Sequence, residues 1–246
     1  PANQPIGVAR GLNPGRVVWV HDPAATTWDG QSLGQVKGYW GRVGSDPDQV
    51  IETYTNQAVV DAMMTHSICW LAGKQDVYEA WDALIKHFNS TKGKGAVGYQ
   101  PGEKVNIKIN LTTTSGSLGW VVSTSGTQTR DRQYAAPSVE LMISLLRQLT
   151  LIVGVDQSDI TMGDTTGTIP NHVYNQLLDA GFDEVVYICK NALPGRVVDT
   201  QDSEVLKFSG PGVGDMYTPV PSTYANADYF INMAILKTHA RAGVTM

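Results

Sequence analysis

Residues 104–111, KVNIKINL, are the most informative segment for the fold. They show the alternation of a β-strand and carry polar side chains near the carboxyl end of that strand. Side chains alternate between the two faces of a strand. One face of this segment is apolar and carries Val105, Ile107 and Ile109. The other face is polar and carries Asn106, Lys108 and Asn110. A central strand of a parallel sheet is apolar on both faces, so Lys108 lies either on the solvated face of an edge strand or against a polar cavity.

Strand and helix patterns alternate on both sides of this segment. Further apolar runs that predict strands cover residues 16–20, 159–163, 184–189 and 229–236. Apolar residues at helical spacing cover residues 46–72, 76–88, 137–150 and 170–180. We therefore expect an α/β fold, with a mainly parallel, Rossmann-like sheet and helices on both of its faces. Residues 196–208 predict a β-hairpin insertion, and the Pro/Gly-rich residues 209–222 predict a loop.

The length of 246 residues fits one domain, so we treat residues 1–246 as a single α/β domain. Residues 1–45 predict an extended amino-terminal segment. The chain begins at Pro1, which suggests that a signal peptide or another segment has been removed. It ends at Met246, shortly after a predicted buried strand, where a doubly wound domain normally continues into a covering helix. We therefore expect that the carboxyl-terminal part of the native domain is missing.

Composition excludes several classes of partner. A formal net charge of −5, without any basic run, argues against nucleic acid or an anionic membrane surface. No apolar stretch approaches the roughly 18–20 residues that span a bilayer. Cys69 and Cys189 form no CxxC pair, so neither a metal knuckle nor a disulfide framework is indicated. A single disulfide between these two cysteines stays open.

Four of the predicted strands end in ionisable or amide side chains. These strand-end residues are His21, Asp22, Lys108, Asn110, Asp164, Thr165, Thr166, Lys237, Thr238 and His239. In an open parallel sheet, ligands bind in the crevice outside the carboxyl ends of the strands. The sequence therefore predicts one site that is assembled from distant parts of the chain.

The segment LKTHARAG, residues 236–243, places a lysine and a histidine two positions apart after an apolar run. Lys237 can bind an anionic group, or act as a base if it is desolvated. His239 can bind a metal ion or transfer protons, although a lone histidine is more often structural. With Lys108 at the same edge of the sheet, these residues predict a carboxylate or phosphate pocket in which Lys108, Lys237 and His239 are the candidate catalytic residues.

The segment GDTTG, residues 163–167, lies between a predicted strand and a predicted helix. It lacks the spacings G-x-G-x-x-G and G-K-[ST], so neither NAD nor a P-loop nucleotide is supported. Asp164 can bind a hard cation, with Thr165 and Thr166 as donors to a ligand. The alternative is an Asx or Ser/Thr turn that caps the next helix.

Two further segments carry weaker signals. His21 and Asp22, in HDP, are candidate metal ligands, or they form a turn that Asp opens before Pro. Arg130 and Arg132 precede the helix predicted from Pro137, where an anion gains from free N–H groups and from bidentate pairing with arginine. The alternative for these arginines is a solvated loop. The identity of a cofactor stays open, with a divalent metal ion as one option.

The segments IKINL (107–111), ITMGDTTG (160–167) and FINMAILKTHARAGVT (230–245) resemble the family called domain of unknown function 362. The opening IGVARGLNPGRVVWVHDPAATTWDG (6–30) is similar to the exported bacterial branch of that family. The resemblance implies an exported, periplasmic or extracellular protein whose signal peptide has been removed. Some relatives carry ferredoxin-type cysteine clusters, but this chain has none, so iron–sulfur binding is not implied.

Three functions remain in view, and one of them is a redox-associated protein that relies on a missing carboxyl-terminal segment. The first is an exported α/β protein that binds a small anionic molecule or a metal ion at the strand ends. In it, Lys108, Lys237 and Arg130 hold the anionic group, Asn110 adds a ligand contact, and Asp164 and His239 bind metal or move protons. The second is a non-catalytic extracellular protein that binds a partner or assembles with copies of itself through its Trp-rich amino-terminal region.

Overall fold

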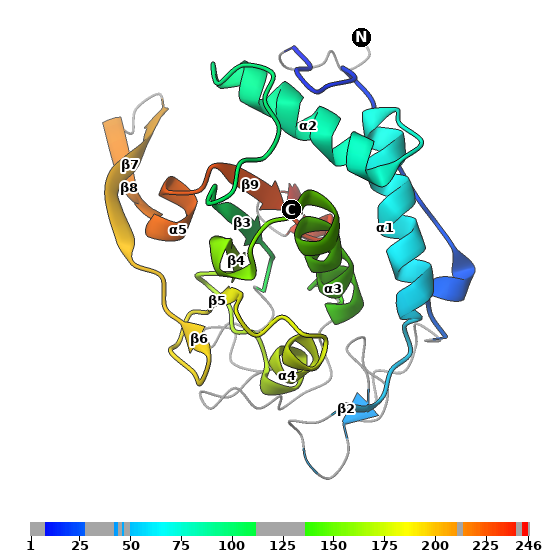
Figure 1. The fold of residues 1–246 in the computed structure, drawn as a ribbon. Coiled ribbons are helices and arrows are strands. Elements are labelled where there is room, and N and C mark those ends of the chain that lie inside the picture. Colours follow the sequence, from blue (N-terminus) through cyan, green and yellow to red (C-terminus); the bar gives the residue numbers. More distant parts are fainter. Residues whose placement is uncertain are drawn as a thin grey trace.

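A five-stranded parallel sheet lies at the centre of the part of the chain that the computed structural model describes (Figure 1), namely residues 8–27, 42–43, 46, 50–111, 136–210, 214–239 and 243–245. Its strand order is β6-β5-β4-β3-β9. The strands are β3 (Val105–Lys108), β4 (Ile160–Gly163), β5 (Val186–Ile188), β6 (Arg196–Val197) and β9 (Tyr229–Asn232). All four pairings are parallel. The predicted α/β fold with a mainly parallel sheet is therefore confirmed.

The remaining elements surround this sheet. The helices are η1 (Pro23–Ala25), α1 (Gln57–Ala72), α2 (Val77–Thr91), α3 (Val139–Arg147), η3 (Gln148–Val153), η4 (Gln157–Asp159), α4 (Asn171–Asp179) and α5 (Ser222–Ala225). Three antiparallel strand pairs complete the described part: β1 (Arg42–Val43) with β2 (Val50–Glu52), β7 (Gln201–Gly210) with β8 (Gly214–Pro221), and β10 (Lys237–His239) with β11 (Gly243–Thr245).

The direction of chain progression reverses at β3. From β3 the sheet grows in one direction through β4, β5 and β6, whereas β9 is added on the other side of β3. Crossovers between parallel strands are right-handed, so connections that run in opposite directions lie on opposite faces. Accordingly, α3 and α4 cover one face, while the return to β9 passes through the β7–β8 hairpin and α5 on the other (Figure 1). Helices thus lie on both faces, as the sequence predicts.

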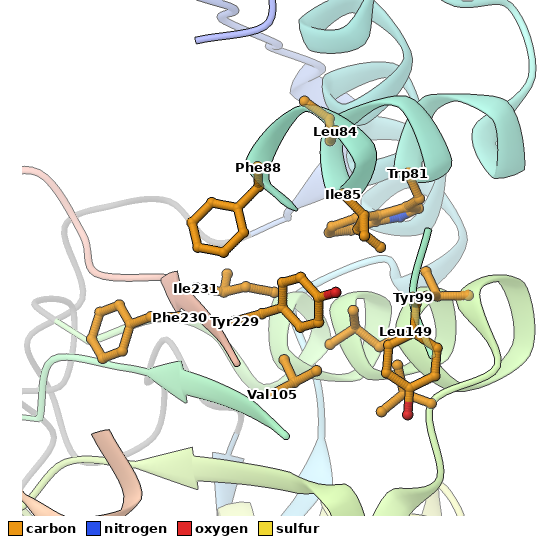
Figure 2. Close-up of a pocket in the computed structure, with 12 residues that line it drawn as sticks. Trp81, Leu84, Ile85, Phe88, Tyr99, Val105, Leu149, Tyr229, Phe230 and Ile231 are labelled. Carbon is orange, nitrogen blue, oxygen red and sulfur yellow. The ribbon is translucent and has the colours of Figure 1, made fainter. Parts of the chain in front are cut away.

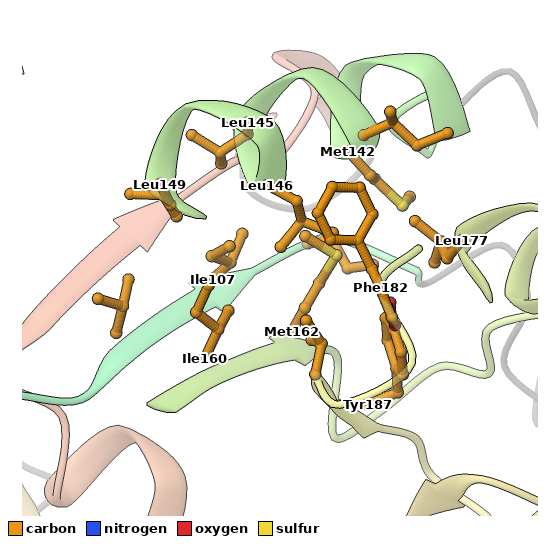
Figure 3. Close-up of a cluster of buried hydrophobic side chains, with 14 of the residues drawn as sticks. Ile107, Met142, Leu145, Leu146, Leu149, Ile160, Met162, Leu177, Phe182 and Tyr187 are labelled. Atoms are coloured by element: carbon orange, nitrogen blue, oxygen red, sulfur yellow. The ribbon is translucent and has the colours of Figure 1, made fainter. Parts of the chain in front are cut away.

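The core lies between the sheet and the helices α2, α3 and α4. In Figure 3, Met142, Leu145 and Leu146 of α3 point toward Ile107 and Met162 of the neighbouring strands β3 and β4. These side chains come from the apolar face of the KVNIKINL alternation and of its partner strand. Burying such side chains contributes about 1.5–3 kcal/mol each. Helix α1 packs outside this layer, against α2 and α3 (Figure 1).

Several predicted elements differ from the structure in type or extent. Residues 16–20 form no strand, and the Val17 and Trp19 side chains are 89% and 82% exposed, so burial does not drive pairing there. Helix α1 begins at Gln57 rather than near residue 46, because the Asn56 carbonyl oxygen Oδ1 caps its first turn and residues 50–52 form β2. Residues 214–221, predicted as loop, form strand β8, which pairs with β7 in the hairpin. The hairpin was predicted over residues 196–208, but Arg196–Val197 instead form β6, which pairs in parallel with β5.

The described helices include none that is both long and apolar enough to pass through a bilayer. Cys69 and Cys189 are both buried and carry free thiols, so they are not paired with each other. Burial raises the pKa of the Cys189 thiol to about 11, and this thiol accepts a hydrogen bond from the backbone N–H of Ile169. Both cysteines therefore serve as small buried side chains.

A buried carboxylate lies where α3 meets the segment before α1. Glu140, in the first turn of α3, is 5% exposed, and its Oε1 accepts a hydrogen bond from the Thr53 hydroxyl at 2.8 Å. Its Oε2 is buried and has no hydrogen-bond partner among the described residues. Burial raises the pKa of Glu140, while hydrogen bonds oppose the rise. Folding therefore favours the protonated form of this side chain.

We expect Glu140→Gln to stabilise the protein near neutral pH. A carboxyl whose pKa is raised on folding stabilises the native state below its unfolded pKa, about 4.3, and this contribution is lost as pH rises through the folded pKa. Urea unfolding of Glu140→Gln should thus give a higher free energy than wild type at pH 7, with a smaller gap at pH 4. The matched control is Glu79→Gln, an exposed glutamate in the first turn of α2. A gap that is equal at both pH values would contradict the expectation.

Candidate functional site

Three of the four predicted polar strand ends lie around the central strand β3: Lys108 and Asn110 at its end, Asp164 after its neighbour β4, and Lys237 in the chain that follows its other neighbour, β9. In the sheet register, Lys108 is the partner of Gly163 on β4 and of Asn232 on β9. Strand β3 is thus an internal strand, which removes the edge-strand interpretation of Lys108. The reversal of strand order falls between β3 and β9, and such a switch point is where open α/β sheets bind ligands at the carboxyl ends.

Lys108, Asn110 and Lys237 form the centre of the candidate site. The Lys237 ammonium donates a hydrogen bond to Asn110 Oδ1 at 3.0 Å, which joins residues 127 positions apart. Partial burial lowers the pKa of Lys237, and the Lys108 ammonium lowers it further, while the Asp164 carboxylate acts in the opposite direction. Lys108 is half-buried, and it forms no ion pair within the described ranges. The fold therefore gathers two lysines and an amide, as the sequence predicts.

Asp164 acts as a buried hydrogen-bond acceptor at the end of β4. Its Oδ2 accepts from the backbone N–H of Leu111 at 2.7 Å, which ties the end of β4 to the chain beyond β3. Its Oδ1 accepts from the backbone N–H and the hydroxyl of Thr166, at 2.8 and 2.7 Å. The hydrogen bond from the Thr166 backbone N–H to Asp164 Oδ1 forms an Asx turn. The Asp164 side chain thus holds the site loop in place while it supplies negative charge beside Lys237.

The two glycines of GDTTG allow this loop to pack against neighbouring backbone. A Cβ on Gly163 would lie 2.0 Å from the carbonyl oxygen of Ile188 on β5. A Cβ on Gly167 would lie 2.3 Å from Leu111 Cβ and 2.4 Å from Leu111 O. Such distances are far below van der Waals contact, so only glycine fits at these two positions. The GDTTG motif is therefore explained by close packing at the strand ends.

A chain of hydrogen bonds covers the polar face of β3 next to the lysines. Asn106, 1% exposed, donates to the hydroxyls of Thr161 at 2.7 Å and Thr223 at 3.3 Å. The Thr223 hydroxyl donates in turn to Asp199 Oδ2 at 2.6 Å. Asn106 Oδ1 is buried and has no hydrogen-bond partner in the described part of the chain. Helix α5, which carries Thr223, thus closes the polar face of the sheet.

Tyr224 of α5 belongs to the same surroundings. Burial raises its pKa, and the carboxylates of Asp164 and Asp199 raise it further. Its ring packs edge-on against Phe230 of β9, with ring centroids 5.1 Å apart. Sequence reasoning did not identify Tyr224, Thr223 or Asp199, because residues 199–225 show no helical periodicity. The signal that could have indicated them was Asn106, a polar residue on the predicted strand at residues 104–111. A buried amide on a strand requires a polar partner on the element that covers the same face of the sheet.

His21 and Asp22 lie away from this site. Asp22 caps η1, and its Oδ1 accepts from the backbone N–H of Ala24 at 2.9 Å, as in the predicted turn. The His21 ring stacks on Trp19, with ring centroids 5.8 Å apart. Helix η1 contacts α1 on the side of that helix that faces away from the sheet (Figure 1). The two residues therefore do not join the strand-end cluster.

The remaining predicted residues are placed as follows. Thr165 is half-buried and Thr166 is exposed, in the loop that Asp164 holds. The backbone of Thr238 and His239 belongs to strand β10, in which these two residues directly follow Lys237. Arg130 and Arg132 lie outside the described residues. Among the residues that the structure describes, no three His, Cys, Asp or Glu side chains gather in a way that could hold a metal ion.

The comparisons with known proteins give one match. The family model described as Domain of unknown function (DUF362) matches residues 135–246. The matched segment contains Asp164, Tyr224 and Lys237, whereas Lys108 and Asn110 precede it. No curated protein and no solved structure matches the chain. The resemblance found in the sequence is therefore confirmed for residues 135–246, and it assigns no activity.

Proposed function

We propose that this chain, which belongs through residues 135–246 to the family Domain of unknown function (DUF362), binds a small carboxylate, sulfate or phosphate group between Lys108 and Lys237. The observation that supports this proposal most strongly is the pairing of the Lys237 ammonium with Asn110 beside a second lysine. Both lysines belong to the carboxyl-end side of the sheet at its switch point, where small ligands bind in this fold class.

Two neighbouring ammonium groups favour an anion for a direct electrostatic reason. Like charges that are held together lower the affinity of each amine for its proton. A bound anion between Lys108 and Lys237 removes this repulsion and accepts charge-assisted hydrogen bonds from both. Asp164 does not take this place, because its two carboxylate oxygens accept from Leu111 and Thr166.

The lowered pKa of Lys237 also bears on chemistry. An amine with a reduced pKa has a larger neutral fraction near neutral pH than an ordinary lysine, and the neutral amine can accept a proton. Lys237 is thus the candidate base of the site, and Lys108 is the residue that we propose binds the anionic group of the ligand. We propose His239, two residues further along β10, as a second proton-transfer group.

Isothermal titration calorimetry with sulfate and with acetate tests the proposal. We expect saturable binding of one anion by wild type, and a loss of about 10- to 100-fold in affinity in Lys108→Gln and in Lys237→Gln, because each removes a hydrogen bond from a charged donor. Lys74→Gln, at an exposed lysine after α1, removes the same charge elsewhere and should bind as wild type does. Preference for sulfate or for acetate separates the phosphate-like from the carboxylate ligands.

Equal affinity in Lys74→Gln, Lys108→Gln and Lys237→Gln would show that the anion binds by general charge alone. Absence of saturable binding of both anions to wild type would exclude the site. Circular dichroism of each variant confirms that the fold is kept.

A second candidate function is supported by the amino-terminal segment, and it involves a partner protein or a second copy of this chain. Val17 and Trp19 are almost fully exposed, and Trp19 forms its ring contact with His21. Exposed apolar groups of this size favour contact with another surface. Native mass spectrometry should then show oligomers of wild type that Trp19→Ser loses. Trp70→Ser is the control, since Trp70 is exposed and stacks on His66 of α1.

We also propose that the protein acts outside the cytoplasm. The support is the similarity of residues 6–30 to the exported branch of the family. Fractionation of cells that express the full-length protein, followed by detection in the periplasm or the medium, tests this proposal. Recovery in the cytoplasm alone would contradict it.

A further inference from the structure

We propose that a second site, separate from the lysine site, binds a small neutral molecule with an aromatic body and a polar end. This site lies between helix α2 and the beginning of β9, at the opposite ends of the strands from Lys108 and Lys237. It consists of an apolar cavity and an adjoining polar cavity.

The apolar cavity has a volume of about 210 Å³. Its walls are formed by side chains that are aromatic or aliphatic: Trp81, Leu84, Ile85, Phe88, Tyr99, Val105, Leu149, Val153, Val155, Tyr229, Phe230 and Ile231. Figure 2 shows Trp81, Ile85 and Phe88 of α2 on one side, with Tyr229 and Ile231 of β9 opposite them. Phe230, which follows Tyr229 on β9, also lines the cavity and is 48% exposed.

The lining favours a flat aromatic body. Aromatic rings attract one another in offset or edge-on arrangements, and such pairs contribute about 0.5–1.5 kcal/mol beyond the area that they bury. Five of the lining side chains carry aromatic rings. The rings of Phe88 and Tyr99 each lie against Tyr229, with centroids 5.7 and 6.4 Å apart, so the walls are already fixed by mutual contacts. A cavity of this size holds a two-ring molecule but not a peptide helix.

The polar cavity, of about 260 Å³, shares Trp81, Ile85, Tyr99 and Val153 with the apolar one. Its other walls include Asp82, Lys86 and Gln100. Asp82 and Lys86 form an ion pair at 2.7 Å, so their charges are mutually satisfied. The Gln100 Nε2 donates to the backbone oxygens of Gly98 and Tyr99, at 3.2 and 3.0 Å, so its Oε1 is the neutral group of this wall that can accept from a ligand. The pair of cavities therefore suits a ligand whose polar end is uncharged.

The size of the combined space supports the same conclusion. Pockets for small organic ligands span roughly 300–1,000 Å³ and combine an apolar lining with a few polar groups. Either cavity alone is smaller than this range, but the two together reach it. A ligand that occupies both places its rings against Tyr229 and its polar end against Gln100.

Fluorescence titration with prodan, a neutral naphthalene ketone, tests the proposal. Prodan emission shifts to shorter wavelength in apolar surroundings, so we expect a saturable blue shift at one equivalent. Val153→Trp places a large side chain in the wall that both cavities share and should abolish the shift. Leu151→Trp is the matched control, because Leu151 is on the same helix, η3, is 77% exposed and lines neither cavity.

A second variant covers the case in which Val153→Trp does not fold. Gln100→Ala changes an exposed side chain and should weaken prodan binding about fivefold, the effect of one neutral hydrogen bond. Lys237→Gln should leave prodan binding unchanged, which separates this site from the anion site. Prodan binding that is absent in wild type, or is equal in Val153→Trp, Leu151→Trp and Gln100→Ala, would overturn the proposal. A wild-type dimer that excludes prodan would assign the cavity to a second copy instead, and would overturn it as well.

Discussion

Gly163→Ala should cost at least about 4 kcal/mol of unfolding free energy, which places it among the exceptional single substitutions. The added methyl group would lie 2.0 Å from the carbonyl oxygen of Ile188 and 2.7 Å from its carbonyl carbon. These are backbone atoms of the neighbouring strand β5, so no side-chain rotation can relieve the clash. The pairing of β4 with β5 must open instead. Since small proteins are stable by only about 5–15 kcal/mol, we expect little soluble native protein.

The measurement is urea unfolding followed by circular dichroism, together with the soluble yield. Gly167→Ala should behave similarly, because its methyl group would meet Leu111 Cβ and O within 2.4 Å. Gly11→Ala is the control, since its Cβ would meet no atom closer than Asn13 O at 4.0 Å. A Gly163→Ala variant as stable as Gly11→Ala would show that the strand ends are not packed as described.

Asp164→Ala should lower the unfolding free energy by about 2–4 kcal/mol. The substitution removes the hydrogen bond that the buried backbone N–H of Leu111 donates to the Asp164 carboxylate, and a hydrogen bond to a charged group contributes about 1.5–3 kcal/mol. It also removes the Asx turn to Thr166. Asp164→Asn keeps one acceptor oxygen and should lose about half as much.

The same unfolding curves, measured with and without EDTA, separate two roles of Asp164. Hydrogen bonding to Leu111 and Thr166 predicts that wild type and Asp164→Ala differ by the same amount in both buffers. A difference that disappears in EDTA would show that a bound metal ion, rather than these hydrogen bonds, accounts for the contribution of Asp164.

The strand-end site could be predicted in outline because its signal is local. The alternation in residues 104–111 requires a polar surrounding for Lys108, and parallel strands bring their carboxyl ends together. Asn110, Asp164 and Lys237 therefore meet although they are far apart in the sequence. The order of the strands was not accessible in the same way, since it depends on which edge of the sheet β9 joins. The reversal at β3, which marks the position of the candidate site, comes from the structure alone.

The errors have a common physical origin. RVVWV at residues 16–20 has strand-forming side chains, but strand formation also needs a partner strand and a face to bury, and the described residues supply neither for Val17 or Trp19. Conversely, residues 214–221 contain Pro219 and Gly214 and look irregular, yet pairing with β7 makes them a strand. The role of Tyr224 could not be predicted, because a helix as short as α5 has no periodicity to detect.

The pH dependence of sulfate binding tests the proposed anion site most directly. Sulfate keeps its charge between pH 7 and about 10.4, the ordinary pKa of lysine. A change in sulfate affinity over this range therefore reports on the protein. The pKa of Lys237 lies below its ordinary value of about 10.4, so the ammonium is lost at a lower pH than in a free lysine. The sulfate affinity of wild type should therefore fall as the pH rises from 7 toward about 10.4. Lys237→Arg stays charged in this range and should keep its affinity. Equal pH dependence in wild type and Lys237→Arg would contradict the account.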